Sequence, residues 1–149
     1  MANLTLGKSL MSLIALVTII GPYLADWSKT HVLNPNWPPH ARFHNGQTMT
    51  TGALLGLLSL YYLHSPAASH SPALHPLSAL NHALLFLHLY YVPALSGILY
   101  PGADWMDPEF GEGRPQLYFF SVVLAVAWVG WWIEKRRIEG VVGKEGKGA

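Results

Sequence analysis

Residues 26–47 read DWSKTHVLNPNWPPHARFHNGQ, and this polar and aromatic segment separates two of the most apolar runs in the chain. It holds three histidines, three prolines and two tryptophans, together with Asp26, Lys29 and Arg42. The flanking runs predict membrane helices, because a helix needs about 20 mostly apolar residues to cross a bilayer. The segment is therefore expected to turn the chain at a membrane surface and to present its ionisable groups there.

The composition also indicates a membrane protein. Of the 149 residues, 51% are hydrophobic and 11% are charged, whereas soluble domains carry about 25% charged residues. A net charge of +1, without a basic stripe, gives no sign of nucleic-acid binding, and we expect none. The lack of cysteine excludes disulfides, thiolate metal ligands and a cysteine nucleophile.

We expect an all-α fold, an integral membrane four-helix bundle that forms one domain over residues 1–138 and is followed by a flexible tail at 139–149. Proline suits the first turn of a helix, so the second helix is expected to begin near Pro38, inside the polar segment. Glycines 52 and 56 form a small-residue pattern that favours close helix packing. The expected spans are residues 6–27, 38–63, 77–100 and 116–137.

Four spans place both termini on the same side of the membrane. That side carries six Lys and Arg residues and the opposite side carries three. The positive-inside rule then predicts cytoplasmic termini. The segment 26–47 and the acidic loop at 101–115 share the other side, which is the lumen in a eukaryotic internal membrane. We expect a multi-pass protein of the endoplasmic reticulum.

The histidines of the segment and nearby carboxylates are the candidate catalytic groups. A helix that starts near Pro38 places His40, His44 and Gln47 on one face. Polar residues at membrane depth usually face a bundle interior or a cavity, so these groups are expected to meet Asp26 in a single cleft. The candidate catalytic residues are Asp26, His31, His40, His44 and Asp104. The candidate substrate-binding residues are Asn34, Trp37, Arg42, Gln47, His88, Tyr91 and Glu109.

Three chemistries fit this set of side chains. Three imidazoles with Asp26 could bind zinc or iron, but no His-Glu-x-x-His motif is present, so we expect neither a metal nor a cofactor. Metal-free acid–base catalysis on a lipophilic substrate is preferred, because histidine can donate or accept a proton near neutral pH. The pocket could also bind a lipid without catalysis. Some of these groups could serve only as loop caps and a membrane-surface anchor.

The segment from Trp27 to His44 resembles a group of small fungal integral-membrane proteins. The shared pattern is a Trp, then Thr30-His31, then Asn34-Pro35 and Trp-Pro-Pro-His-Ala-x-Phe-His at 37–44. Proteins of this kind resemble the epoxide hydrolases and cyclases of fungal polyketide and terpenoid pathways. The resemblance implies secondary-metabolite biosynthesis with a hydrophobic, oxygenated substrate.

Epoxide opening, by hydrolysis or by cyclisation, is accordingly the first choice of reaction. A double-bond isomerase or a terpenoid cyclase would use the same site. A lipid-binding or scaffold protein is the non-enzymatic alternative. The expected partners are a lipophilic small molecule and membrane lipids, and a bundle this small could also form a homo-oligomer.

Overall fold

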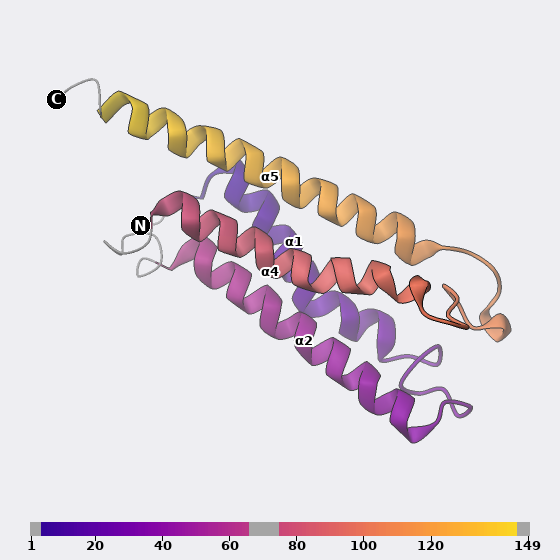
Figure 1. The fold of residues 1–149 in the computed structure, drawn as a ribbon. Helices are drawn as coiled ribbons and strands as arrows, with labels where there is room; N and C mark the ends of the chain where they lie inside the picture. Colours follow the sequence, from indigo (N-terminus) through magenta and orange to yellow (C-terminus); the bar gives the residue numbers. More distant parts are fainter. Residues whose placement is uncertain (1–3, 66–74, 146–149) are drawn as a thin grey trace.

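The computed structural model describes residues 4–65 and 75–145, and within these ranges four long helices form a bundle in which each runs antiparallel to the one before it in the chain (Figure 1). Two short 3-10 helices, η1 (Gly97–Leu99) and η2 (Pro108–Phe110), lie between the last two long helices, and the described residues form no strand. The all-α bundle expected from the sequence is confirmed. The long helices are α1 (Leu6–Asp26), α2 (Pro39–His64), α4 (Pro76–Ser96) and α5 (Pro115–Glu145).

The helices begin at residues whose chemistry suits a helix start. The Thr5 hydroxyl accepts from the backbone N–H of Lys8 at 3.3 Å and caps α1. Pro39 opens α2, where its missing N–H costs no helical hydrogen bond. His75 Nδ1 accepts from the N–H of Leu77 at 3.1 Å and caps α4. These local signals explain why the expected helix starts agree with the structure to within one residue.

The end of the last helix differs from the expectation. α5 continues to Glu145, so residues 139–145, which the sequence suggested were part of a flexible tail, are helical. Lys135 and Glu139 form an ion pair at 3.8 Å with the helical i, i+4 spacing, and Ile138 is buried. Residues 146–149 of the expected tail, and residues 66–74 between α2 and α4, lie outside the described part of the chain.

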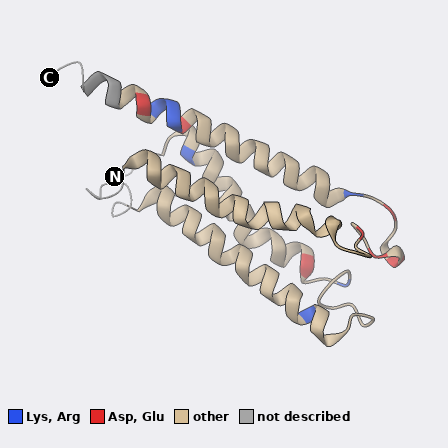
Figure 2. Ribbon diagram, viewed as in Figure 1, with Lys and Arg blue, Asp and Glu red and all other residues tan. Residues whose placement is uncertain are grey.

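Three helices, α1, α4 together with η1, and α5, are long and apolar enough to cross a membrane. Figure 2 shows that Lys, Arg, Asp and Glu gather at the two ends of the bundle and leave its middle uncharged. The outward faces expose large apolar side chains, which suit lipid better than water. Examples are Leu16, Ile20, Leu57, Leu85, Val122 and Trp132. The protein is therefore a helical membrane bundle, whereas a crossing by the more polar α2 stays a prediction.

Glycines bring α1 close to both of its neighbours. A Cβ added at Gly56 of α2 would lie 2.7 Å from the Ala15 carbonyl oxygen of α1. A Cβ added at Gly7 of α1 would lie 2.7 Å from the Gly130 carbonyl oxygen of α5. The packing role predicted for Gly56 is thus confirmed. From the contact between Gly7 and Gly130, α1 and α5 diverge toward the loop end of the bundle (Figure 1).

A buried carboxylate joins α1 and α5 at the end of the bundle where both termini lie. The Glu134 side chain is fully buried and accepts two hydrogen bonds from the Arg137 guanidinium, at 2.9 and 2.7 Å. It also accepts a hydrogen bond from the Thr5 hydroxyl. The carboxylate is paired on both oxygens, which is the arrangement that a buried charge requires.

His64, the last residue of α2, lies at the same end. Its Nε2 is 2.7 Å from the Ser12 hydroxyl of α1. Burial, and then the positive charge of Lys8, lower the pKa of His64 from its ordinary value of 6.5, because both disfavour the imidazolium. This end of the bundle therefore holds His64 in its neutral form more strongly than water would.

Candidate functional site

A cavity of about 660 Å³, called here the large cavity, lies at the loop end between α1, α4 and α5. Cavities of roughly 300–1,000 Å³ commonly hold drug-sized ligands. Most of its wall is apolar or aromatic, with Val17, Pro22, Leu24, Tyr91, Phe119 and Phe120 among the lining residues. The polar side chains in its wall are Asp26, His31, Thr48, Tyr90 and Gln116.

Asp26 and His31 form a pair in this wall. Asp26 is the last residue of α1, and the turn that follows is held by hydrogen bonds from the N–H groups of His31 and Leu33 to the Ser28 carbonyl, at 3.2 and 2.9 Å. The turn brings His31 Nε2 to 3.8 Å from Asp26 Oδ1. Asn45 Nδ2 of α2 donates to the other oxygen, Asp26 Oδ2, at 2.9 Å. The carboxylate is therefore oriented, with one oxygen facing the imidazole.

A short chain of hydroxyl groups determines which nitrogen of His31 carries a proton. The Ser28 hydroxyl donates to the Ala25 carbonyl at 2.8 Å. The Thr30 hydroxyl, 2.8 Å from Ser28 Oγ, must then be the donor in that contact. Thr30 Oγ1 is left to accept from His31 Nδ1, which is 2.8 Å away. His31 thus carries a proton on Nδ1 and directs Nε2 toward Asp26.

A polar clamp joins the link between α1 and α2 to the acidic loop before α5. Asn34 Nδ2 and Asn36 Nδ2 donate to the two oxygens of Glu109, at 2.7 and 3.1 Å. Trp37 Nε1 donates to Asp107 Oδ2 at 3.0 Å. These contacts hold the link, and with it the turn that carries His31, against the loop.

Four residues predicted to bind substrate lie in or beside the clamp instead of in the cavity wall. Asn34, Trp37 and Glu109 use their polar atoms in the clamp. Arg42 donates to the Asn34 carbonyl at 2.6 Å and so also supports the link. None of the four lines the large cavity. They were predicted to bind substrate, whereas their contacts are those of residues that position the loops.

His40 and His44 form a second, separate pair. Their Nε2 atoms are 2.9 Å apart, and His44 Nδ1 is 3.1 Å from Gln47 Oε1. The predicted helical face is therefore confirmed. Both imidazoles are exposed, however, and neither lines the large cavity. The prediction that one cleft holds all three histidines is therefore wrong. Of the three, only His31 lines the large cavity together with Asp26.

Comparison with known proteins identifies the family of the chain. The sequence matches the family described as "Family of unknown function (DUF6640)" over residues 10–145. The chain belongs to the DUF6640 family. No curated protein and no solved structure matches it. The match covers α2, α4 and α5 in full and α1 from residue 10 onward, so the fold described here is that of a DUF6640 protein.

Two further predicted residues of this DUF6640 chain have defined contacts away from the large cavity. Asp104 is exposed, and its carboxylate accepts from the N–H of its neighbour Trp105 at 2.7 Å; it does not line the large cavity. His88 accepts from Trp128 Nε1 at 3.0 Å, and its Nδ1 donates to the Leu84 carbonyl at 2.9 Å, so it joins α4 to α5 as a neutral imidazole. His88 is thus a hydrogen-bond partner between helices, and neither it nor Asp104 lines the large cavity.

Tyr91 does line the large cavity, as predicted for a substrate-binding residue. Its side chain is 1% exposed, and its hydroxyl is 3.0 Å from Thr18 Oγ1. Thr18 donates to the Ile14 carbonyl, so the Tyr91 hydroxyl is the donor to Thr18. Only the Tyr91 ring is left to contact a ligand.

Gln116 was not predicted, although it lies at the start of α5 and lines the large cavity. Its Nε2 donates to the Trp105 carbonyl at 2.7 Å. Its Oε1 is buried and has no hydrogen-bond partner among the described residues. A buried acceptor of this kind usually has a partner, so Gln116 could accept a hydrogen bond from a ligand. The sequence did offer one signal for Gln116: like Asp26, it is a polar residue at the end of an apolar run.

The metal-binding alternative requires several ligands in one place. Within residues 4–65 and 75–145, His, Asp and Glu side chains do not gather in groups of three or more that could hold a metal ion. The three histidines of the segment are divided between the His40–His44 pair and the wall of the large cavity. The chemistry available in the cavity is therefore that of one carboxylate, one imidazole and neutral hydrogen-bonding groups.

Proposed function

We propose that the protein is a membrane enzyme that carries out acid–base chemistry on a lipophilic, oxygenated molecule in the large cavity. The observation that carries the proposal is the Asp26–His31 pair, which lies in the wall of an otherwise largely apolar cavity at the loop end of the bundle. An apolar cavity favours a lipophilic ligand, and the pair offers it both a proton donor and a proton acceptor.

Epoxide opening is the reaction that this pair serves best. His31 holds one proton on Nδ1 through the hydroxyl chain. A second proton, on Nε2, makes it an imidazolium beside the Asp26 carboxylate. Such a pair places an acid and a base 3.8 Å apart. Both residues line the large cavity. The 27–44 motif resembles that of small fungal membrane proteins, some of which resemble epoxide hydrolases and cyclases, and this supports the same substrate class.

In the proposed reaction, His31 Nε2 donates its proton to the epoxide oxygen as one carbon–oxygen bond of the ring breaks. A water molecule, or a hydroxyl group of the substrate, forms the new bond to that carbon and gives its proton to Asp26. Water yields a diol, and an internal hydroxyl yields a cyclic ether with one alcohol. Transfer of the proton from Asp26 back to His31 restores the starting charges. Gln116 Oε1 is a suitable acceptor for the attacking hydroxyl.

The test is turnover of a panel of long-chain alkyl and polyene epoxides by the full chain in lipid nanodiscs, with products identified by mass spectrometry. We expect Asp26→Asn and His31→Gln to lower kcat by about 100- to 10,000-fold, the usual contribution of a positioned acid or base. Glu112→Gln is the matched control, because Glu112 is an exposed carboxylate in the loop before α5.

Equal conversion by wild type and Asp26→Asn would refute the proposal. A wild-type protein that retains these epoxides without converting them would instead be a lipid-binding protein. Formation of a shifted double bond from an unsaturated ketone would indicate the isomerase, which would use the same imidazole and carboxylate.

We further propose a four-pass protein of the endoplasmic reticulum with cytoplasmic termini. The basic residues of α5 and Lys8 lie at the terminal end, and the acidic loop lies at the opposite end (Figure 2). The chain has no cysteine, so single cysteines introduced by Glu112→Cys and Glu139→Cys report on the two ends. A membrane-impermeant maleimide added to sealed microsomes should label position 139 and not position 112. The reverse pattern would overturn this orientation.

A further inference from the structure

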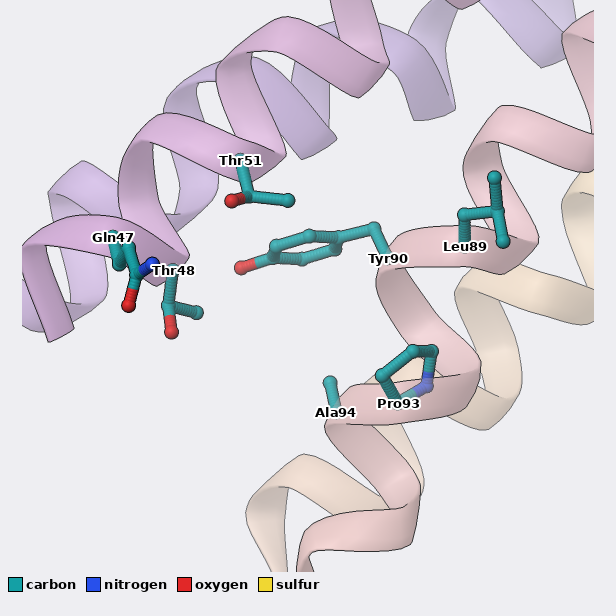
Figure 3. A pocket seen from close by; sticks show the side chains of 7 residues that line it. All are labelled: Gln47, Thr48, Thr51, Leu89, Tyr90, Pro93 and Ala94. Carbon is teal, nitrogen blue, oxygen red and sulfur yellow. The ribbon is translucent and has the colours of Figure 1, made fainter. Parts of the chain in front are cut away.

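A second cavity, of about 310 Å³, lies between α2 and α4 beside the large cavity. Figure 3 shows its wall: one side carries polar residues of α2 and the other side carries residues of α4. The lining residues are Gln47, Thr48, Thr51, Leu89, Tyr90, Pro93 and Ala94. Polar side chains in a lipid-facing part of a bundle are costly, which makes such a cavity a candidate binding site.

Tyr90 is held so that its hydroxyl reaches the polar side of this cavity. A Cβ added at Gly52 of α2 would lie 2.8 Å from Cε2 of Tyr90, so the ring lies directly over this glycine. Figure 3 shows the ring of Tyr90 extending from α4 toward α2, with its hydroxyl on the side of Thr48 and Thr51. Three side-chain hydroxyls from two helices thus line one small space. The Thr48 hydroxyl donates to the His44 carbonyl at 3.1 Å, which leaves the hydroxyls of Tyr90 and Thr51 to donate to a ligand.

The α4 wall adds a backbone acceptor. Pro93 has no N–H, so it cannot donate to the carbonyl oxygen of Leu89 one turn earlier. Both residues line the second cavity. The second cavity is therefore lined by the hydroxyls of Tyr90 and Thr51 and by the residue whose carbonyl lacks its usual helical donor, and a hydroxyl group is the ligand function that can both donate and accept.

The two cavities share part of their wall. Thr48, Tyr90 and Ala94 line both of them. We propose that the second cavity binds a hydroxyl group at the far end of the ligand whose other end lies beside Asp26 and His31. The ligand class is then an elongated lipophile with oxygen functions at both ends. Only the placement of the ligand's reacting end beside Asp26 and His31 rests on the proposed function.

The experiment measures binding rather than turnover, with dodecanol and the dodecane α,ω-diol as probes. Each probe competes with a fluorescent long-chain alcohol for the full chain in nanodiscs, and each affinity is corrected for the probe's partition into empty nanodiscs. We expect wild type to bind the diol about 3- to 10-fold more tightly than dodecanol, the gain typical of one added hydrogen bond.

Two variants and one control locate that preference. Tyr90→Phe and Thr51→Val remove hydroxyls from the second cavity and should each reduce the preference for the diol to about 1- to 2-fold. Thr50→Val is the matched control, because the Thr50 hydroxyl donates to the Gly46 carbonyl at 3.0 Å and Thr50 does not line the cavity. It should keep the wild-type preference.

A wild-type protein without preference for the diol would overturn the inference, and so would a preference that persists in both Tyr90→Phe and Thr51→Val. In those cases epoxide conversion that still depends on Asp26 would leave the proposed function standing. Conversely, the wild-type protein could prefer the diol, lose that preference in Tyr90→Phe and Thr51→Val, and convert no epoxide. That result would support the second binding site and refute the proposed enzymatic function.

Discussion

Glu109→Ala should destabilise the protein by disconnecting the link between α1 and α2 from the acidic loop. In the folded protein the two oxygens of Glu109 accept hydrogen bonds from Asn34 and Asn36. The Asn34 side chain is 1% exposed, so without Glu109 its amide donor is left buried and unpaired. An unpaired buried donor costs about 1–3 kcal/mol.

The second hydrogen bond contributes less. Asn36 is exposed, and its hydrogen bond of 3.1 Å competes with water, so its loss adds only about 0.5 kcal/mol. The expected loss of stability is therefore about 2.5 kcal/mol. For a chain of this size each kcal/mol corresponds to roughly 2–4 °C, so Tm should fall by about 5–10 °C.

The assay is thermal unfolding in detergent, followed by circular dichroism, together with amide hydrogen exchange. Glu112→Ala removes the same charge from the same loop and is the control, with an expected change in Tm under about 2 °C. Exchange in Glu109→Ala should rise most at residues 28–36, because that link loses its clamp. Equal Tm values for Glu109→Ala and Glu112→Ala would refute the reasoning.

Gly7→Ala should lower stability by about 1–3 kcal/mol in the same unfolding assay, because the new Cβ would meet the backbone of α5; Gly140→Ala, with open space around its Cα, should instead gain about 0.5–1 kcal/mol. Arg137→Met should cost about 2–4 kcal/mol by leaving the buried Glu134 carboxylate without its cation, and an unchanged Tm would contradict this. Because folding lowers the pKa of His64, the unfolded chain binds more protons in acid. Stability should therefore be complete above about pH 6.5 and fall below it, and His64→Gln should reduce that fall.

The helices were predictable because their signals are local. Apolar runs indicated their number and approximate ends, and the proline pair at positions 38 and 39 marked the start of α2. The end of α5 was not predictable from composition. Its Gly/Lys/Glu-rich segment is typical of a disordered tail, but the i, i+4 ion pair of Lys135 with Glu139 and the burial of Ile138 favour helix at its start.

The site was predictable only where sequence neighbours form it. Asp26 and His31 are five residues apart and meet through one turn. His40 and His44 were placed correctly relative to each other but not relative to Asp26. The side of α2 that meets α1 is marked by Gly52, and twelve residues of helix rotate His40 about 120° away from it. That rotation could have been worked out from the glycine pattern.

The rest of the cavity depends on tertiary structure. Tyr90 and Gln116 belong to helices that are far from Asp26 in sequence, and no local pattern says that they share a wall with it. The acidic loop was expected to supply a catalytic carboxylate. The structure uses Asp107 and Glu109 for hydrogen bonds to the α1–α2 link, a contact that depends on loop geometry rather than on composition.

At the contact between Gly7 and Gly130, α1 and α5 are held close together at one end of the bundle, so the angle between the two helices sets their separation at the other end. Along α1, about 18 residues separate Gly7 from Ala25, a length of about 27 Å at 1.5 Å per residue. Each degree of tilt between the two helices then moves their far ends apart by about 0.5 Å. Bilayer thickness or lateral pressure, acting on this angle, would widen or narrow the space around Asp26, so the lipid itself can tune which molecules fit.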